Sequence, residues 1–151
     1  MLTASQVVTK EFLTISPEMS VEELARLLLR KDFTGAVVVD KKGKLLGVVT
    51  EGDLIAKEKN LHLPTVVSLF DSAIYLETSE HFKVELHKMV ATKVDDIYTR
   101  APVTIEMTST LADIATLMSE KRIHYLPVMH EERVEGVVGR REVLRALAEG
   151  S

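Results

Sequence analysis

Two short stretches place chemically useful side chains where a strand is expected to turn into a helix. In the first, residues 45–49 form an apolar run typical of a buried strand, and Asp53 follows three positions after Thr50. This spacing predicts a capping box, in which the hydroxyl accepts a helical N–H and the carboxylate reaches back. A strand that turns directly into a helix also points backbone N–H groups at the space above the sheet edge, where ligands are usually held. A cap and a ligand site are both open interpretations of Thr50 and Asp53.

The second stretch carries two adjacent bases, Arg140 and Arg141, in the first turn of an expected helix. The helix macrodipole disfavours positive charge at that end by roughly 0.3–1 kcal/mol, so arginine is locally a poor choice. An anion above the helix end would be attracted by the guanidinium groups and the helical N–H groups together, and we therefore predict phosphate contacts. The alternative is a solvated pair near neighbouring acids, which are Glu131, Glu132 and Glu142.

The elements that position these stretches form a unit that begins with a capped helix. Ser20 and Glu23 predict another capping box, and apolar residues at helical spacing predict a helix over about 21–30. Two apolar strands then follow at residues 36–39 and 45–49, with a polar turn at 40–44 between them. A final helix is expected over about 53–59.

The unit occurs twice at an almost constant offset. Thr14 and Thr104 are 90 positions apart and Gly47 and Gly136 are 89 apart, so the second turn is one residue shorter. Two copies that each expose an apolar sheet face are expected to pair across an approximate two-fold axis, with a cleft between them. We predict an α+β fold, a tandem pair of β-α-β-β-α repeats whose sheets pack against each other. We expect the first repeat over residues 1–60 and the second over residues 94–151. A connecting arm with a helix near 80–91 is expected over residues 61–93.

Composition narrows the classes of function. The 151 residues are 46% hydrophobic, which is enough for a core, and the absence of cysteine excludes disulfides and predicts a cytoplasmic location. We find neither a leader nor an apolar run of about 18 residues, so no membrane association is expected. A net charge of -4 argues against a nucleic-acid partner.

Catalytic and metal-binding signals are weak. No nucleophile elbow, phosphate-binding loop or dinucleotide fingerprint is found, and no catalytic residue is predicted. None of the five histidines pairs with another at i, i+4, and His81 with Glu85 lacks further ligands, so no metal site is predicted. His124, just before a strand of the second repeat, either faces the cleft or lies in a turn.

The ordered set of motifs resembles the cystathionine-β-synthase-type (CBS) domain pair over nearly the whole chain. The segments that carry the resemblance are Thr9-Lys10, FLTI at 12–15, GVVTEGDL at 47–54, DIYTR at 96–100 and HYLPV at 124–128. The resemblance implies a non-catalytic regulatory module without an obligatory cofactor, which binds AMP, ADP, ATP or a related adenosyl compound between its repeats. It also implies a homodimer, a flat disc of four repeats, that passes a change of shape to a protein partner.

In such a module an aspartate at the position of Asp53 holds both ribose hydroxyls and a threonine at Thr50 assists. The residues implied to flank the base are Leu13, Thr14, Gly35, Ala36 and Val37. The chemistry supports the first role, since one carboxylate offers two acceptor oxygens to the two donors of a cis-diol, in bonds worth about 1.5–3 kcal/mol each.

The second repeat departs from this pattern, with Gly139 in place of the hydroxyl residue and Glu142 in place of the aspartate. The longer glutamate would place its oxygens differently, so we predict one competent site per chain, around Asp53. The alternative function is a dimerising protein-interaction module whose nucleotide site is degenerate and empty.

Overall fold

The structure is a computed structural model that describes residues 2–60 and 92–149. The expected helix near 80–91, residues 61–79 of the connecting arm and His81 lie outside the described residues, whereas residues 92 and 93 of the arm are described. The elements of the first repeat are α1 (Ala4–Val7), β1 (Thr14–Ile15), α2 (Val21–Lys31), β2 (Gly35–Val39), β3 (Leu45–Thr50) and α3 (Glu51–Asn60). Those that follow the arm are η1 (Val94–Asp96), β4 (Thr99–Arg100), β5 (Ile105–Glu106), α6 (Leu111–Lys121), β6 (Tyr125–His130), β7 (Arg133–Gly139) and α7 (Arg140–Glu149).

The two repeats have the same strand register, which confirms the repeat at the level of hydrogen bonding. One sheet has the order β1-β2-β3-β4 and the other β5-β6-β7. Ile15 of β1 pairs in parallel with Val38, and Ile105 of β5 pairs in parallel with Val128, each 90 residues further on. The β2–β3 and β6–β7 hairpins each have a register shift one residue after that pair.

Helices α2 and α6 each begin with a hydroxyl cap, which at Ser20 is one half of the predicted capping box. The Ser20 hydroxyl accepts a hydrogen bond from the Glu23 N–H at 3.1 Å, and the Thr110 hydroxyl accepts one from the Asp113 N–H at 3.1 Å. Each cap starts a helix whose apolar side packs on its own sheet, where Leu24 and Ile114 are the equivalent, fully buried residues.

Each sheet and the helices packed on it form one folded body, and the segment that leads into each repeat pairs with the body of the other repeat. The sequence did not predict this exchange. The N-terminal segment pairs with the second body, since Thr9 and Val137 exchange two backbone hydrogen bonds of 3.0 Å. In return, β4 pairs with β3 of the first body, Gly47 opposite Arg100. Each edge segment therefore joins one body to the other along the chain.

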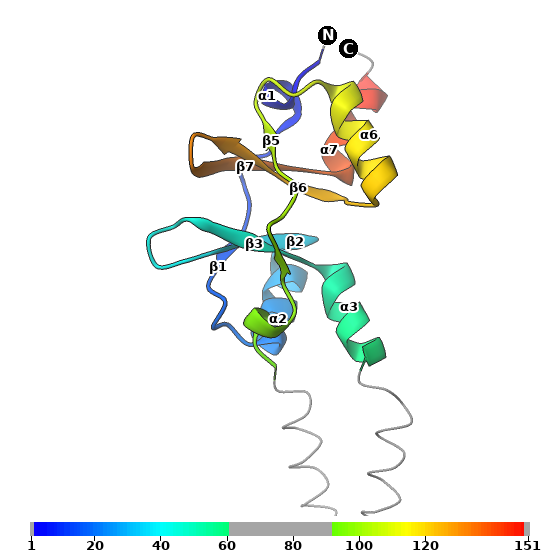
Figure 1. The fold of residues 1–151 in the computed structure, drawn as a ribbon. Coiled ribbons are helices and arrows are strands. Elements are labelled where there is room, and N and C mark those ends of the chain that lie inside the picture. The colour runs from blue at the N-terminus through cyan, green and yellow to red at the C-terminus, as the bar shows by residue number, and fades with distance from the viewer. Residues whose placement is uncertain (1, 61–91, 150–151) are drawn as a thin grey trace, which may run out of the picture.

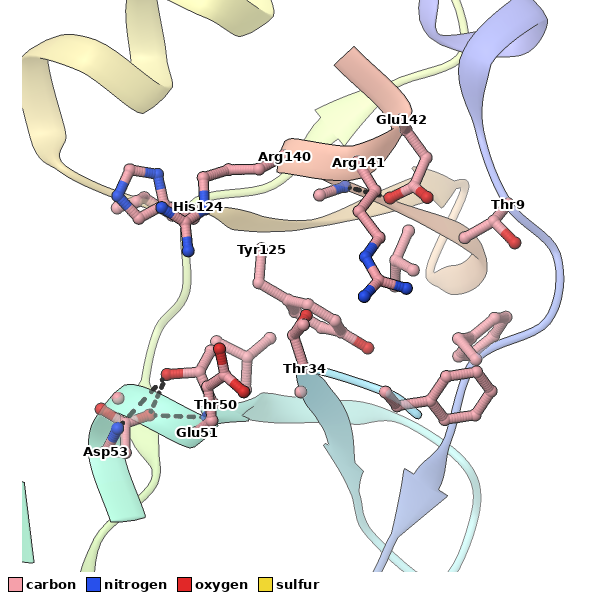
Figure 2. Close-up of a pocket in the computed structure, with 18 of the residues that line it drawn as sticks. Thr9, Thr34, Thr50, Glu51, Asp53, His124, Tyr125, Arg140, Arg141 and Glu142 are labelled. Atoms are coloured by element: carbon pink, nitrogen blue, oxygen red, sulfur yellow. Dashed lines mark hydrogen bonds between the residues drawn. The ribbon is translucent and has the colours of Figure 1, made fainter. Parts of the chain in front are cut away.

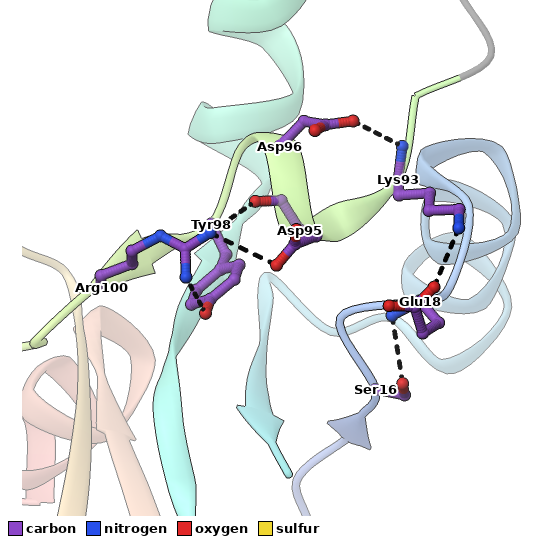
Figure 3. A network of polar contacts seen from close by, with 7 residues as sticks. All are labelled: Ser16, Glu18, Lys93, Asp95, Asp96, Tyr98 and Arg100. Carbon is purple, nitrogen blue, oxygen red and sulfur yellow. Dashed lines mark hydrogen bonds and ion pairs between the residues drawn. The ribbon is translucent and has the colours of Figure 1, made fainter.

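A polar network holds the segment before β4 on the first body (Figure 3). The Lys93 ammonium lies 2.9 Å from a Glu18 carboxylate oxygen, and the Val94 N–H donates to the Met19 carbonyl at 2.8 Å. Arg100 bonds the Asp95 carboxylate at 3.3 Å on the surface. The backbone bond and the buried side chain of Val94 contribute more to this attachment than the exposed ion pairs, which water screens.

The two sheets pack face to face, as predicted. Val37 and Val48 of the first sheet form one buried cluster with Tyr125 and Val137 of the second. In Figure 1, α3 and α7 lie on the same side of the sheets and run in opposite directions from the level where the sheets meet. The first turns of both helices therefore lie close to the boundary between the repeats.

Candidate ligand-binding cleft

A cleft of about 970 Å³ lies between the two repeats. Its lining includes the first turns of α3 and α7, the loops before β2 and β6, and both exchanged segments. Figure 2 shows side chains from the two helix starts on opposite walls, with Tyr125 between them. A second, smaller cleft of about 490 Å³ lies between the β2–β3 and β6–β7 hairpins.

The capping box at the start of α3 is present. The Asp53 Oδ2 atom accepts from the Thr50 N–H at 2.9 Å and lies 3.3 Å from the Thr50 hydroxyl, which in turn is 3.4 Å from the Asp53 N–H. Oδ1 makes no hydrogen bond with any described residue. The cap thus fixes the half-buried Asp53 carboxylate with one oxygen directed at the backbone N–H of Thr50.

The second repeat makes the same cap with different residues. The Gly139 N–H donates to Glu142 Oε1 at 2.7 Å, so the extra methylene of glutamate does not prevent the backbone bond. No hydroxyl takes part, because glycine stands where the first repeat has Thr50.

The two arginines of α7 are exposed on the opposite wall of the cleft from Asp53. The Arg141 Nη1 atom lies 3.3 Å from Oδ2 of Asp32, so this ion pair crosses between the repeats. Both side chains are more than 60% exposed, at 64% and 83%, and we expect the pair to contribute less than about 1 kcal/mol to stability. Arg141 therefore pairs with Asp32 and not with Glu131, Glu132 or Glu142, the acids that the alternative interpretation of the sequence placed near it.

Tyr125 is a cleft residue that the sequence reasoning did not identify. It is only 6% exposed, and its hydroxyl has no hydrogen-bond partner among the described residues. Burial raises the pKa of the Tyr125 phenol far above its ordinary value, and the negative charge of Glu142 adds to the rise. The ring lies against Gly35, where an added Cβ would be 2.9 Å from a ring carbon.

Most of the predicted site residues line the large cleft: Thr50, Asp53, Gly35, His124, Arg140 and Arg141. His124 is exposed at the rim, so the cleft interpretation describes its position better than an isolated turn. Thr14 and Val37 line the smaller cleft instead, while Leu13 and Ala36 line neither and belong to the core of the first body. Their contact with a base stays a prediction.

Further residues reach the large cleft through contacts that no local pattern reveals: Thr9, Phe12, Thr34, Thr99, Pro102 and Arg122. Several lie on the exchanged segments. Their one signal in the sequence is the repeat itself, because Thr9 and Thr99 occupy equivalent positions 90 residues apart.

Within residues 2–60 and 92–149, no group of three metal-ligating side chains could hold a metal ion. None of the helices in these segments has the length and apolar character needed to cross a membrane.

Comparisons with known proteins agree with this architecture. A family model described as CBS domain matches residues 4–68 and 94–149. The uncharacterized protein MJ1426 of Methanocaldococcus jannaschii is 29% identical over 150 residues, covering 93% of this chain and 88% of its own length. The chloroplastic CBS domain-containing protein CBSX2 of Arabidopsis thaliana is 30% identical over 139 residues, which span 87% of this chain and 57% of that protein.

Solved structures show the same fold. CBSX2 in complex with AMP is similar with a TM-score of 0.72 at 26% identity, covering 99% of this chain and 98% of that chain. The CBS domain pair of protein MJ0100, in complex with 5-methylthioadenosine and S-adenosyl-L-methionine, has a TM-score of 0.72 at 20% identity and covers 100% of this chain and 99% of that one. The chain belongs to the CBS domain family and is a tandem pair of CBS domains.

Proposed function

We propose that this chain is a regulatory module that binds an adenosine-containing ligand, namely AMP, ADP, ATP or a related adenosyl compound, in the cleft around Asp53. The observation that carries the proposal is that Thr50 and Asp53 of one repeat and Arg140 and Arg141 of the other line one cleft. Acceptors for a ribose diol and cations for a phosphate are therefore available on opposite walls. The complex of CBSX2 with AMP supports the choice of ligand class.

The cap shapes how Asp53 would hold a ribose. Its bond from the Thr50 N–H at 2.9 Å orients the carboxylate before any ligand arrives, so little side-chain entropy remains to be lost on binding. One hydroxyl of the diol would donate to Oδ1 and the other to the second lone pair of Oδ2. A phosphate would draw Arg141 away from Asp32, exchanging one exposed anion for another.

The proposal is tested by measuring thermal stability and binding heat against AMP, ADP, ATP, 5-methylthioadenosine and S-adenosylmethionine. A ligand at about 100 times its dissociation constant should add about 2.7 kcal/mol to the free energy of unfolding. Asp53→Asn keeps an oxygen for the Thr50 N–H but removes the charge, and should weaken binding about 10- to 100-fold. Glu142→Gln is the matched control and should leave the affinity nearly unchanged. Equal effects of the two variants, or no shift with any compound at millimolar concentration, would contradict the proposal.

The second candidate is an interaction module with an empty site. It is favoured by the engagement of both candidate carboxylates in caps, Asp53 with Thr50 and Glu142 with Gly139. In either case we propose a homodimer of four repeats in the cytoplasm. The ligand-binding module signals to a protein partner by a change of shape, whereas the module with an empty site recruits a protein partner.

A further inference from the structure

Structurally equivalent positions of the two repeats carry opposite charges near the cleft. Asp32 and Arg122 follow α2 and α6 in the same left-handed conformation, with φ of 56° and 54°. Glu51 and Arg140 are the first residues of α3 and α7. The equivalence therefore rests on backbone geometry as well as on the alignment of the repeats.

The same inversion holds for the cleft lining as a whole. The first repeat contributes four acids and neither lysine nor arginine: Glu11, Asp32, Glu51 and Asp53. The second contributes four arginines, Arg122, Arg140, Arg141 and Arg145, against the single acid Glu142. The cleft lining is thus acidic on the side of the first repeat and basic on the side of the second.

Exposed apolar residues accompany these charges on the helices. Ile55 and Leu144 are equivalent residues, 69% and 62% exposed, and each lies one turn after Glu51 or Arg140 on the same helix face. Leu147, 64% exposed, extends the patch on α7. Ile55 and Leu144 both line the large cleft, and α3 and α7 lie on the same side of the sheets (Figure 1), so this helix face is available to one partner surface.

A second copy could cover this surface in two orientations. A parallel dimer places α3 on α3 and α7 on α7, so that Glu51 meets Glu51 and Arg140 meets Arg140. An antiparallel dimer places α3 on α7, so that Glu51 meets Arg140 and Ile55 meets Leu144. The equivalent acids Asp53 and Glu142 face a like charge in both orientations and do not distinguish them. We infer that the occupant of the α3–α7 face is a second copy of this chain in the antiparallel orientation.

Glu51 and Arg140 form no ion pair with any described residue of their own chain. Among the described residues, the ion pair that crosses between the repeats joins Arg141 and Asp32. The inference rests on the homodimer of the proposed function and adds its orientation. Glu51, Ile55, Arg140 and Leu144 also line the large cleft, so the orientation is tested without nucleotide.

Cysteine cross-linking tests the orientation directly, because the chain has no cysteine of its own. Ile55→Cys and Leu144→Cys are made separately with different mass tags, mixed without nucleotide and oxidised. The expected product is a disulfide dimer that joins one copy of each variant, whereas each variant alone gives little. Lys42→Cys, in an exposed hairpin turn, measures collisional cross-linking. Self-cross-linking of Ile55→Cys, absence of any cross-link above this control, or a monomer by light scattering overturns the inference.

Charge reversal gives an independent measurement by sedimentation without nucleotide. Glu51→Arg and Arg140→Glu should each raise the dimer dissociation constant about tenfold, because two attractive surface pairs per dimer become repulsive. The double variant restores both pairs and should return to within about threefold of the parent. Failure of the double variant to recover, while light scattering still shows dimers of the parent, refutes the orientation but leaves the proposed dimer and ligand site standing.

Discussion

Gly136 is where the N-terminal segment crosses the second sheet, and alanine there should loosen that segment. Thr9 and Val137 exchange two backbone hydrogen bonds of 3.0 Å beside it. A Cβ at Gly136 would lie 2.4 Å from Val8 Cγ2 and 2.6 Å from the Thr9 carbonyl oxygen. The obstacle is partly backbone, so a change of rotamer does not relieve it.

The cost follows from these distances. Non-bonded carbon contacts are favourable at about 3.5–4.0 Å, so the segment must withdraw by about 1 Å. Withdrawal loses two backbone hydrogen bonds worth about 0.5–1.5 kcal/mol each, while retention strains the packing by about 1–3 kcal/mol. Either route lowers the free energy of unfolding by about 2 kcal/mol, or the melting temperature by about 4–8 °C in a chain of this size.

Urea and thermal denaturation of Gly136→Ala measure this loss. Gly52→Ala is the matched control, because among the described residues its Cβ would meet only the Thr50 hydroxyl oxygen, at 3.5 Å, within a helix. That variant should gain up to about 1 kcal/mol from helix propensity. Since the N-terminal segment also carries Thr9 and Phe12 to the cleft, Gly136→Ala should weaken any ligand there too. If Gly136→Ala is as stable as Gly52→Ala, the reasoning from close approach is wrong.

Three further predictions concern single side chains. Tyr125→Phe should stabilise the ligand-free protein by about 1 kcal/mol in urea denaturation, because it removes a buried hydroxyl without a hydrogen-bond partner in the described residues. A loss of stability would instead show that the hydroxyl makes a hydrogen bond in the protein. Asp40 accepts from the N–H groups of Lys44 and Lys42, which lower its pKa, so its contribution to stability is present at neutral pH and is lost as the pH falls through the folded pKa. An NMR titration that places this pKa at or above its ordinary value would contradict that account. Ser20→Ala and Thr110→Ala should each cost about 1 kcal/mol in thermal denaturation, and equal melting temperatures of parent and variants would show that the caps contribute nothing.

Local patterns predicted most of the fold because its elements are set by local interactions. The Ser20 and Thr110 caps and the turns of the two hairpins follow from residues within a few positions of one another. The exchanged segments do not. β4 consists of Thr99 and Arg100, and a two-residue strand carries too little pattern to identify its partner. Gly47 and Gly136 mark both crossings, but close approach by a distant backbone is visible only in three dimensions.

The predicted base contacts illustrate a second limit. Gly35, Ala36 and Val37 are consecutive in β2, and adjacent residues of a strand face opposite sides of the sheet. Gly35 and Val37 accordingly face Tyr125 of the other repeat, whereas Ala36 lies in the core of its own body. The side chains of the three residues cannot all face one cleft, and the sequence resemblance did not say which face the cleft would occupy.

The capping box does not distinguish a structural aspartate from a ribose-binding one. Gly139 and Glu142 make the same backbone bond, at 2.7 Å, so an acid three positions after the strand is sufficient for the cap in both repeats. What differs is the charge that each acid faces across the cleft. A ligand with its ribose on Asp53 would direct its phosphate toward the arginine-bearing start of α7, whereas the equivalent ligand on Glu142 would direct it toward Glu51 at the start of α3. We therefore expect one nucleotide per chain on electrostatic grounds, and the exchange of aspartate for glutamate becomes the smaller of the two reasons.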